Sequence, residues 1–133
     1  MKVYVTHCSA KKDGSFKESN VKTTPYRLYT AAPTRRFMNR CKQQGVERAI
    51  FSDKHGVWFF DTENDWYEKD QNSVNVDEFA DLVRDFDMKL SKYDEILFYY
   101  NPGRFHRLYK RLIDASALKG KVKAITHLEE TVR

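Results

Sequence analysis

The sequence predicts a three-layer α/β fold, with a mostly parallel sheet of about four or five strands and helices on both faces. Short apolar segments that suit strands alternate along the chain with longer segments of helical periodicity. The strand segments are apolar at consecutive positions, as is typical of parallel strands covered on both faces. The chain has 133 residues, 41% of them hydrophobic, so we expect a single domain over residues 1–133 with one core.

Four apolar segments are expected to form the main strands. They are Lys2–His7, about Arg48–Phe51, the apolar run of DEILFYYNPG that ends at Asn-Pro-Gly, and KVKAIT, which ends at Thr126. The segment 57–75 is too long for an ordinary connection, and it has room for an extra short strand at 57–60. We expect the rest of that segment to be a flap or a binding loop.

Three segments have apolar residues at helical spacing. In TRRFMNRCKQQG, Thr34 is expected to cap the helix and Gly45 to end it. The longest helix is expected in VDEFADLVRDFDMKLSKY, where Asp77 and Glu78 lie in the first turn. A third helix is expected in FHRLYKRLIDAS.

Composition limits the class of protein. Charged residues make up 32% of the chain and the mean hydropathy is -0.75, which excludes a bilayer protein. The longest apolar runs, such as Ile96–Tyr100, are too short to span a membrane, and no apolar signal-peptide core is present. We therefore expect a cytoplasmic protein in which Cys8 and Cys41 are reduced thiols. The oligomeric state is left open.

The charge balance permits a partner that bears phosphate. The formal net charge is +5, with 24 Lys and Arg against 19 Asp and Glu, and the pI is about 9.2. A basic surface of this size is also compatible with ordinary solvated faces.

Polar side chains follow each predicted strand. The residues are His7, Cys8, Lys11 and Lys12 after the first strand, Ser52, Asp53, Lys54, His55 and Gly56 after the second, Tyr100, Asn101, Gly103 and Arg104 after the third, and His127 after the fourth. The carboxyl ends of parallel strands meet at one edge of the sheet, where ligands bind. The sequence thus predicts one candidate site there.

Cys8 is the candidate nucleophile of this site. Lysines beside it and a nearby helix N-terminus would lower the pKa of its thiol. The alternative is that Cys8 is a small buried hydrophobic residue. Cys41 lies on a helical apolar stripe and is expected in the core.

Two loops offer cations at the same edge. Lys11 and Lys12 precede Gly14 in a loop that suits an anion, although no P-loop motif is present, and the alternative is an exposed loop with ordinary lysines. In SDKHG, Lys54 and His55 suit an anion contact and general acid–base chemistry, and the alternative is an ordinary turn.

Three further features have two interpretations each. Arg104 either contacts an anion at a helix start or belongs to a tight turn. Trp66 and Tyr67 either stack on a base or pack their loop down. His7, Cys8, His55 and His127 have the side chains of a zinc site, but no zinc spacing motif is present, so no metal is expected. No cofactor is assigned.

Three stretches, HCSAKK, TPYRLYTAAPTRRF and FSDKHGVW, resemble a family of small Rossmann-like domains. That family has Cys-x-x-Lys-Lys after its first strand, Leu-Tyr-Thr-x-x-x-x-Arg before its first helix and Ser-x-Lys-His-Gly after its second strand. HCSAKK is also similar to a motif in the catalytic domain of archaeosine synthases, which modify a deazaguanine base in tRNA. The resemblance covers about the first half of the chain.

The resemblance implies a Rossmann-like fold and a nucleotide-like ligand. It implies that NDWYEKD, which contains Tyr67, crosses the site. The residues implied to line the site are Cys8, Lys11, Lys12, Tyr29, Lys54, His55 and Gly56.

We therefore expect an enzyme or binding protein that acts on a nucleobase, nucleotide or nucleic acid. As an enzyme it would be a nucleotide- or RNA-modifying transferase, with Cys8 as nucleophile and a lysine or His55 handling protons. The alternative is a non-catalytic module that binds RNA or DNA through its basic surface. A third option is a subunit whose exposed aromatic residues form a protein interface.

Overall fold

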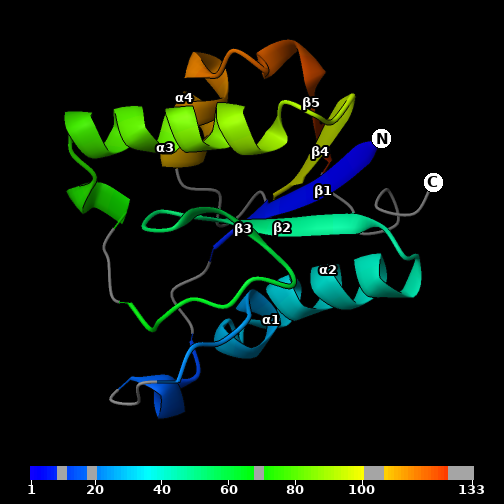
Figure 1. Ribbon diagram of the computed structural model, residues 1–133, viewed down its shortest axis with the longest axis vertical. Coiled ribbons are helices and arrows are strands. Elements are labelled where there is room, and N and C mark those ends of the chain that lie inside the picture. The colour runs from blue at the N-terminus through cyan, green and yellow to red at the C-terminus, as the bar shows by residue number, and fades with distance from the viewer. Residues whose placement is uncertain (9–11, 18–20, 68–70, 101–106, 126–133) are drawn as a thin grey trace.

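The computed structural model describes residues 1–8, 12–17, 21–67, 71–100 and 107–125 of the chain, and it shows an α/β fold (Figure 1). Its sheet has five strands in the order β3-β2-β1-β4-β5. The strands are β1 (Lys2–His7), β2 (Glu47–Ser52), β3 (Gly56–Phe59), β4 (Glu95–Tyr99) and β5 (Val122–Ile125). All neighbouring pairs are parallel except β2 and β3, which are antiparallel.

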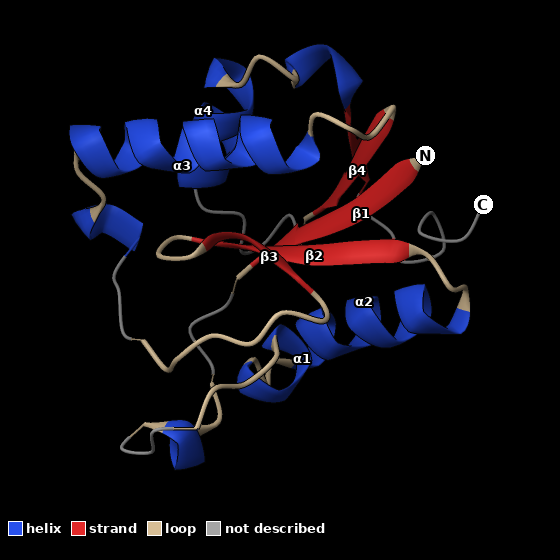
Figure 2. Ribbon diagram, viewed as in Figure 1, coloured by secondary structure: helices blue, strands red, loops and turns tan. Residues whose placement is uncertain are grey.

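Helices lie on both sides of this sheet (Figure 2). They are α1 (Pro25–Leu28), α2 (Ala32–Gln43), α3 (Val76–Leu90) and α4 (Arg107–Ala115), with 3-10 turns at Gly14–Phe16, Gln71–Ser73 and Lys119–Lys121. Figures 1 and 2 show α3 and α4 on one side and α1 and α2 on the other. Ring contacts agree with this arrangement, because Phe51 packs on Phe86 of α3 and Tyr109 of α4, whereas Tyr99 stacks on Phe37 of α2.

The apolar strand segments form strands at or near the predicted bounds. β1 has the bounds predicted for it, and its consecutive residues Val3, Tyr4 and Val5 are all buried. The extra short strand predicted at 57–60 is β3, which lies at the edge of the sheet. A strand with both faces covered excludes water from consecutive side chains, which explains the unbroken apolar runs.

The prediction that Thr34 caps the second helix is wrong. α2 begins at Ala32 after the N-cap Ala31, and Thr34 lies buried within the first turn. Pro33 fixes a helical φ and lacks an N–H, so it suits this first turn and allows the earlier start. The short helix α1, which begins at Pro25, was not predicted.

The longest helix has a strong start signal. Asn75 accepts a hydrogen bond from the backbone N–H of Glu78 (2.8 Å), and the Glu78 carboxylate accepts one from the Asn75 N–H (3.1 Å). This reciprocal capping box satisfies two N–H groups that the helix itself leaves unpaired. Its last buried apolar residue is Leu90.

The strand order defines where a ligand site is expected. From β1 the chain passes to β2 and β3 on one side, and then crosses to β4 and β5 on the other. The order reverses between β1 and β4, and a crevice at the carboxyl ends of the strands forms at such a switch point. Cys8 follows β1 directly, so its backbone lies at this place.

None of the helices in the described part of the chain has the length and apolar character needed to cross a membrane.

Candidate functional site

The backbone holds Cys8 in line with the end of β2. Its N–H donates to the carbonyl oxygen of Phe51 (2.9 Å), which extends the ladder between β1 and β2 by one step. Its Sγ lies 2.8 Å from Tyr109 Oη and 3.8 Å from Asp53 Oδ1. The Cys8 side chain is therefore both buried, at 4% exposed, and in contact with polar groups.

Several hydroxyl groups surround this thiol. The hydroxyls of Tyr29 and Tyr67 form a hydrogen bond with each other, and both interact with the side chain of Ser52. Tyr67 also forms a side-chain hydrogen bond with Cys8. We call this set the thiol–phenol cluster; its members are Cys8, Tyr29, Ser52, Asp53, Tyr67 and Tyr109. All six are buried.

Burial controls ionisation in this cluster. Desolvation raises the pKa of Cys8, and the nearby Asp53 carboxylate raises it further, whereas hydrogen bonds from Tyr109 and Tyr67 lower it. The net direction is upward, so the expectation of a lowered thiol pKa is wrong. Burial likewise raises the pKa of Tyr29 and Tyr67. At neutral pH the thiol and both phenols are thus protonated.

Two histidines and one lysine lie around the cluster. The His7 ring stacks on Tyr109 with a centroid distance of 5.4 Å. The His55 ring packs edge-on against Tyr67 at 5.0 Å. Lys12 Nζ lies 4.6 Å from the centroid of the Tyr67 ring. Desolvation lowers the pKa of both imidazoles, so both are neutral near pH 7.

Ser52 shapes the loop that follows β2. Its Oγ accepts hydrogen bonds from the backbone N–H groups of Lys54 (3.2 Å) and His55 (3.0 Å). The Lys54 side chain is exposed, and its ammonium forms no hydrogen bond or ion pair with any other residue that the structure describes. Of the two predicted groups of this loop, His55 therefore contacts the cluster and Lys54 points to solvent.

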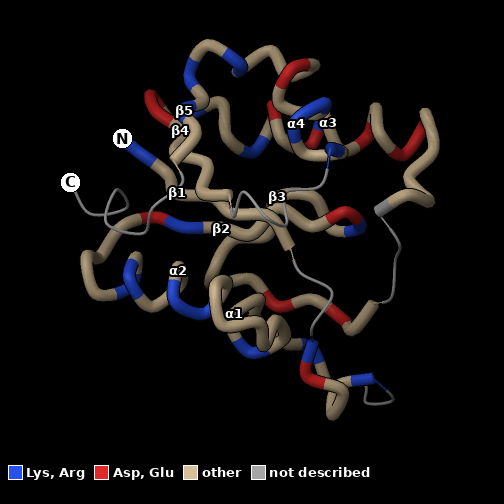
Figure 3. Tube along the Cα trace, turned by 180° about the vertical axis from the view of Figure 1, so that it is seen from behind, with Lys and Arg blue, Asp and Glu red and all other residues tan. Residues whose placement is uncertain are grey.

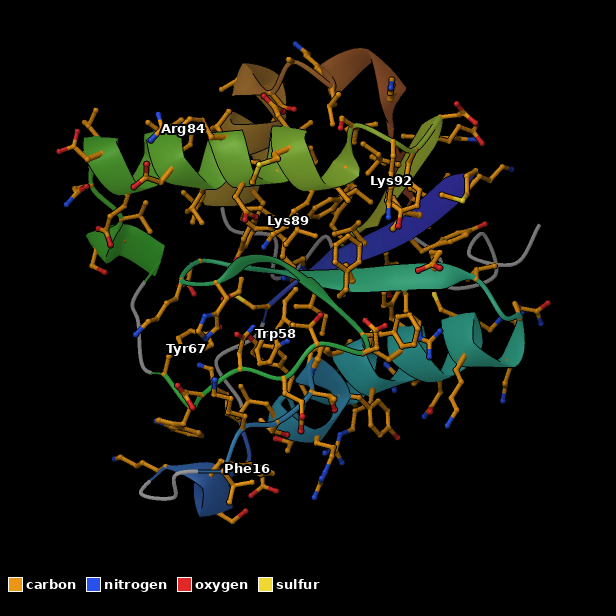
Figure 4. All side chains as sticks on the ribbon, in the orientation of Figure 1. Phe16, Trp58, Tyr67, Arg84, Lys89 and Lys92 are labelled. Atoms are coloured by element: carbon orange, nitrogen blue, oxygen red, sulfur yellow. The ribbon has the colours of Figure 1, made fainter. Side chains whose placement is uncertain are left out.

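Gly56, predicted as a ligand residue, is explained by the packing of the hairpin between β2 and β3. Its φ is +71°, and an added Cβ would lie 2.2 Å from Asp85 Oδ2. Asp85 Oδ2 accepts a hydrogen bond from the Val57 N–H (2.7 Å), and Asp85 Oδ1 pairs with Lys89 Nζ (2.7 Å). Lys89, which Figure 4 shows between α3 and this hairpin, donates to the Val57 carbonyl (3.0 Å). Because Gly56 has no side chain, the Asp85 and Lys89 side chains of α3 can hydrogen-bond to the backbone of β3 at Val57.

The structure brings together most of the predicted site residues. Those that lie in or against the thiol–phenol cluster are His7, Cys8, Lys12, Tyr29, Ser52, His55 and Tyr67. The Tyr67 ring is buried and so anchors its loop to the rest of the molecule. It lies near Trp58, on the side of the sheet that α1 and α2 cover (Figure 4). The predicted Lys11, Asn101 and Arg104, and His127 of the zinc alternative, fall outside the described residues.

Two cluster residues had no role in the predicted site. Asp53 was recognised only as a residue after the second strand, although a carboxylate that directly follows a buried strand was a signal for it. Tyr109 lies in the segment FHRLYKRLIDAS, which was expected only to form a helix with apolar residues at helical spacing. Periodicity predicts which face of α4 is buried, but it does not show that the hydroxyl reaches Cys8.

The cluster can supply proton transfer and anion contacts. Asp53 is placed to accept a proton from Cys8, and Lys12 carries a positive charge on the face of a buried phenol ring. Among the residues that the structure describes, no three His, Cys, Asp or Glu side chains are grouped so as to hold a metal ion. A phosphate-bearing ligand or cofactor would use Lys12 among the described groups.

No family model matches the chain, and the searches of curated proteins and of solved structures found no match either.

Proposed function

We propose that the protein is an enzyme that acts on a nucleobase or nucleotide, free or within a nucleic acid, in a base-modification or transfer reaction with Cys8 as nucleophile. The main support is the position of the Cys8 thiol, which lies at the reversal of the strand order in contact with Asp53 and Tyr109. We also propose that the fold is a three-layer Rossmann-like arrangement.

The neighbours of Cys8 suit a thiol that ionises only during the reaction. When Sγ adds to the electrophilic carbon of a ring C=N bond, its proton passes to the Asp53 carboxylate 3.8 Å away, and the ring nitrogen that receives the electron pair of that bond takes a proton from the Lys54 ammonium. The Tyr109 hydroxyl, 2.8 Å from Sγ, then donates to the developing thiolate. The neutral His55 imidazole and the exposed Lys54 ammonium remain available to handle protons on the substrate.

The surroundings of the cluster favour a flat ligand with a negative group. The partly exposed His55 ring packs edge-on against the buried Trp58 and Tyr67 rings, and a planar heterocycle stacks well on a ring held in this way. Lys12 adds a cation within reach of the same rings. A nucleobase or nucleotide combines these two properties.

Binding tests the proposal first. Amide chemical shifts of the full chain are followed as free bases, nucleosides and nucleoside monophosphates are added. We expect shifts at Cys8, Ser52 and His55. If no compound shifts these amides at about 10 mM, where even weak ligands bind, the proposal is wrong.

Two cysteine variants then separate chemistry from binding. Cys8→Ser should still bind the ligand but lose the covalent adduct and the turnover. Cys41→Ala is the matched control, because Cys41 lies buried on α2 and should leave both unchanged. An adduct of unchanged yield in Cys8→Ser would exclude Cys8 as the nucleophile.

A second candidate function, nucleic-acid binding without catalysis, is favoured by the charge of α2. This helix carries Arg35, Arg36, Arg40 and Lys42 and no acidic residue, and Figure 3 shows the basic residues along it. None of the four forms an ion pair with another residue in the described ranges. Filter binding to tRNA and to single-stranded DNA should then weaken steeply as salt rises. Absence of salt-dependent retention would exclude this function.

A further inference from the structure

A cavity lies away from the thiol–phenol cluster. Its volume is about 440 Å³, and it is bounded by the α2 side of β2, the chain that follows β3, and α1. The lining residues that matter here are Tyr26, Asn39, Lys42, Arg48, Phe60 and Asp61. None of them belongs to the cluster around Cys8.

The register of the sheet separates the two places. Arg48 pairs with Tyr4, whereas Phe51, whose carbonyl holds Cys8, pairs with His7. Three residues of a strand span about 10 Å. A ligand in this cavity therefore requires nothing of Cys8.

Arg48 is held in place, and no carboxylate in the described part of the chain pairs with it. Its guanidinium lies 3.9 Å from the centroid of the Phe60 ring, and its Nη1 donates to the carbonyl oxygen of Val46 (3.1 Å). These contacts fix the planar group but leave its charge unbalanced.

Lys42 adds a second positive charge to the same cavity. Neither Lys42 nor Arg48 forms an ion pair with Asp61, or with any other carboxylate among the described residues. Two cations and one acid thus line a concave surface whose excess charge is positive. A concave surface concentrates this field and favours an anion.

We propose that this cavity binds a nucleoside monophosphate. Arg48 and Lys42 would hold the phosphate, because a planar guanidinium matches two phosphate oxygens at once. Asp61, which only accepts hydrogen bonds when ionised, suits the ribose hydroxyls. The Tyr26 ring has the Arg35 guanidinium over one face, 5.3 Å from its centroid, and its other face suits the base. The volume lies within the range of about 300–1,000 Å³ that small-molecule sites occupy.

Nuclear magnetic resonance on the full chain tests this site with adenosine 5′-monophosphate, adenosine and inorganic phosphate as probes. We expect the monophosphate to shift the amides of Asn39, Arg48 and Phe60 in a saturable way. Adenosine and phosphate alone should bind more weakly, because each makes only part of the contacts. If the monophosphate does not shift these amides at about 10 mM, the proposal is wrong.

Two variants of α2 separate the cavity from general charge attraction. Lys42→Ala removes a lining cation and should weaken binding about tenfold. Arg36→Ala is the matched control, since Arg36 carries the same charge on the same helix but does not line the cavity. It should change affinity less than about twofold. Equal weakening in both variants would overturn the proposal in favour of diffuse attraction.

A third variant keeps this test independent of the proposed function. Cys8→Ser should leave the shifts at Asn39, Arg48 and Phe60 unchanged, whatever it does to chemistry at the cluster. If Cys8→Ser abolishes those shifts, the cavity is not a separate site and the proposal fails.

Discussion

The ionisation of Cys8 depends on neighbours that act in opposite directions. Burial and the Asp53 carboxylate raise the pKa of the thiol, while hydrogen bonds from Tyr109 and Tyr67 lower it. Because the opposing groups are in direct contact with the sulfur, removing a single hydroxyl should shift the balance measurably.

Tyr109→Phe should raise the pKa of Cys8 further, because it removes the hydroxyl 2.8 Å from Sγ and leaves the ring in place. The rate of Cys8 alkylation by iodoacetamide, followed by peptide mass spectrometry, should fall at pH 8, and its pH profile should move to higher pH. Tyr93→Phe is the control, since Tyr93 is also buried but is not in the cluster. An unchanged profile in Tyr109→Phe would contradict the role given to this hydroxyl.

Two partly buried imidazoles should make folding stability depend on pH. Burial lowers the pKa of His7 and His55 in the folded state, so the unfolded chain binds more protons below the ordinary pKa of about 6.5. The stability that the neutral imidazoles contribute to the folded state is therefore fully present above pH 6.5. It is lost as the pH falls toward the lower pKa values that these histidines have in the folded protein. Urea unfolding at pH 7.5 and 5.5 should show lower stability at pH 5.5. His55→Gln should make the difference smaller, and an equal difference in the variant would contradict this.

At the scale of single elements, Gly56→Ala should strongly destabilise the attachment of β3 to α3. The change adds strain at φ +71° and forces the Asp85 carboxylate away from Val57 and Lys89. We expect a loss of about 3 kcal/mol in the free energy of unfolding by urea. Gly45→Ala is a matched control, since its φ is +63° and nothing lies within 4 Å of the added Cβ. It should cost about 1 kcal/mol. Equal losses would mean that the Asp85 contacts contribute nothing.

Helices and strands could be predicted from the sequence where a local pattern of apolar and capping residues determines them. Unbroken apolar runs located the strands, and the acidic first turn at Asp77 and Glu78 and the spacing of apolar residues located α3. The start of α2 was misplaced because Pro33 and Ala31 outweigh the capping tendency of Thr34. The antiparallel direction of β3 depends on its pairing with β2, which the sequence does not specify by periodicity.

The grouping of the candidate site residues could be predicted from the sequence, but their electrostatics could not. Parallel strand ends share an edge, so His7, Cys8 and Ser52 were expected together. Whether Cys8 is protonated at neutral pH depends on how deeply its sulfur is buried and on whether a negative or a positive side chain lies closer to it. Only the folded structure shows that Asp53 contacts the sulfur while Lys12 lies over the Tyr67 ring.

At the scale of the whole molecule, charge is unevenly distributed. The basic residues of α2 lie on one side of the sheet, and on the other side α3 carries five acidic residues and two basic ones. Helix α4, on the same side as α3, adds three basic residues and one acidic residue, so that side carries both signs, whereas α2 carries basic residues only (Figure 3). A nucleic acid that is attracted by this molecule should therefore approach the α2 side.

Two charge reversals test whether position or total charge governs that attraction. Arg36→Glu on α2 and Arg84→Glu on α3 each lower the formal net charge of +5 by two. Both arginines are exposed, and Arg84 already pairs with Asp81. If the α2 side contacts phosphate, Arg36→Glu should weaken tRNA retention several-fold and reduce the slope of log affinity against log salt by about one unit. Arg84→Glu should leave both nearly unchanged, because the acidic neighbours on α3 repel phosphate before and after the change. Equal weakening by both variants would mean that only the total charge matters and that α2 is not a binding face.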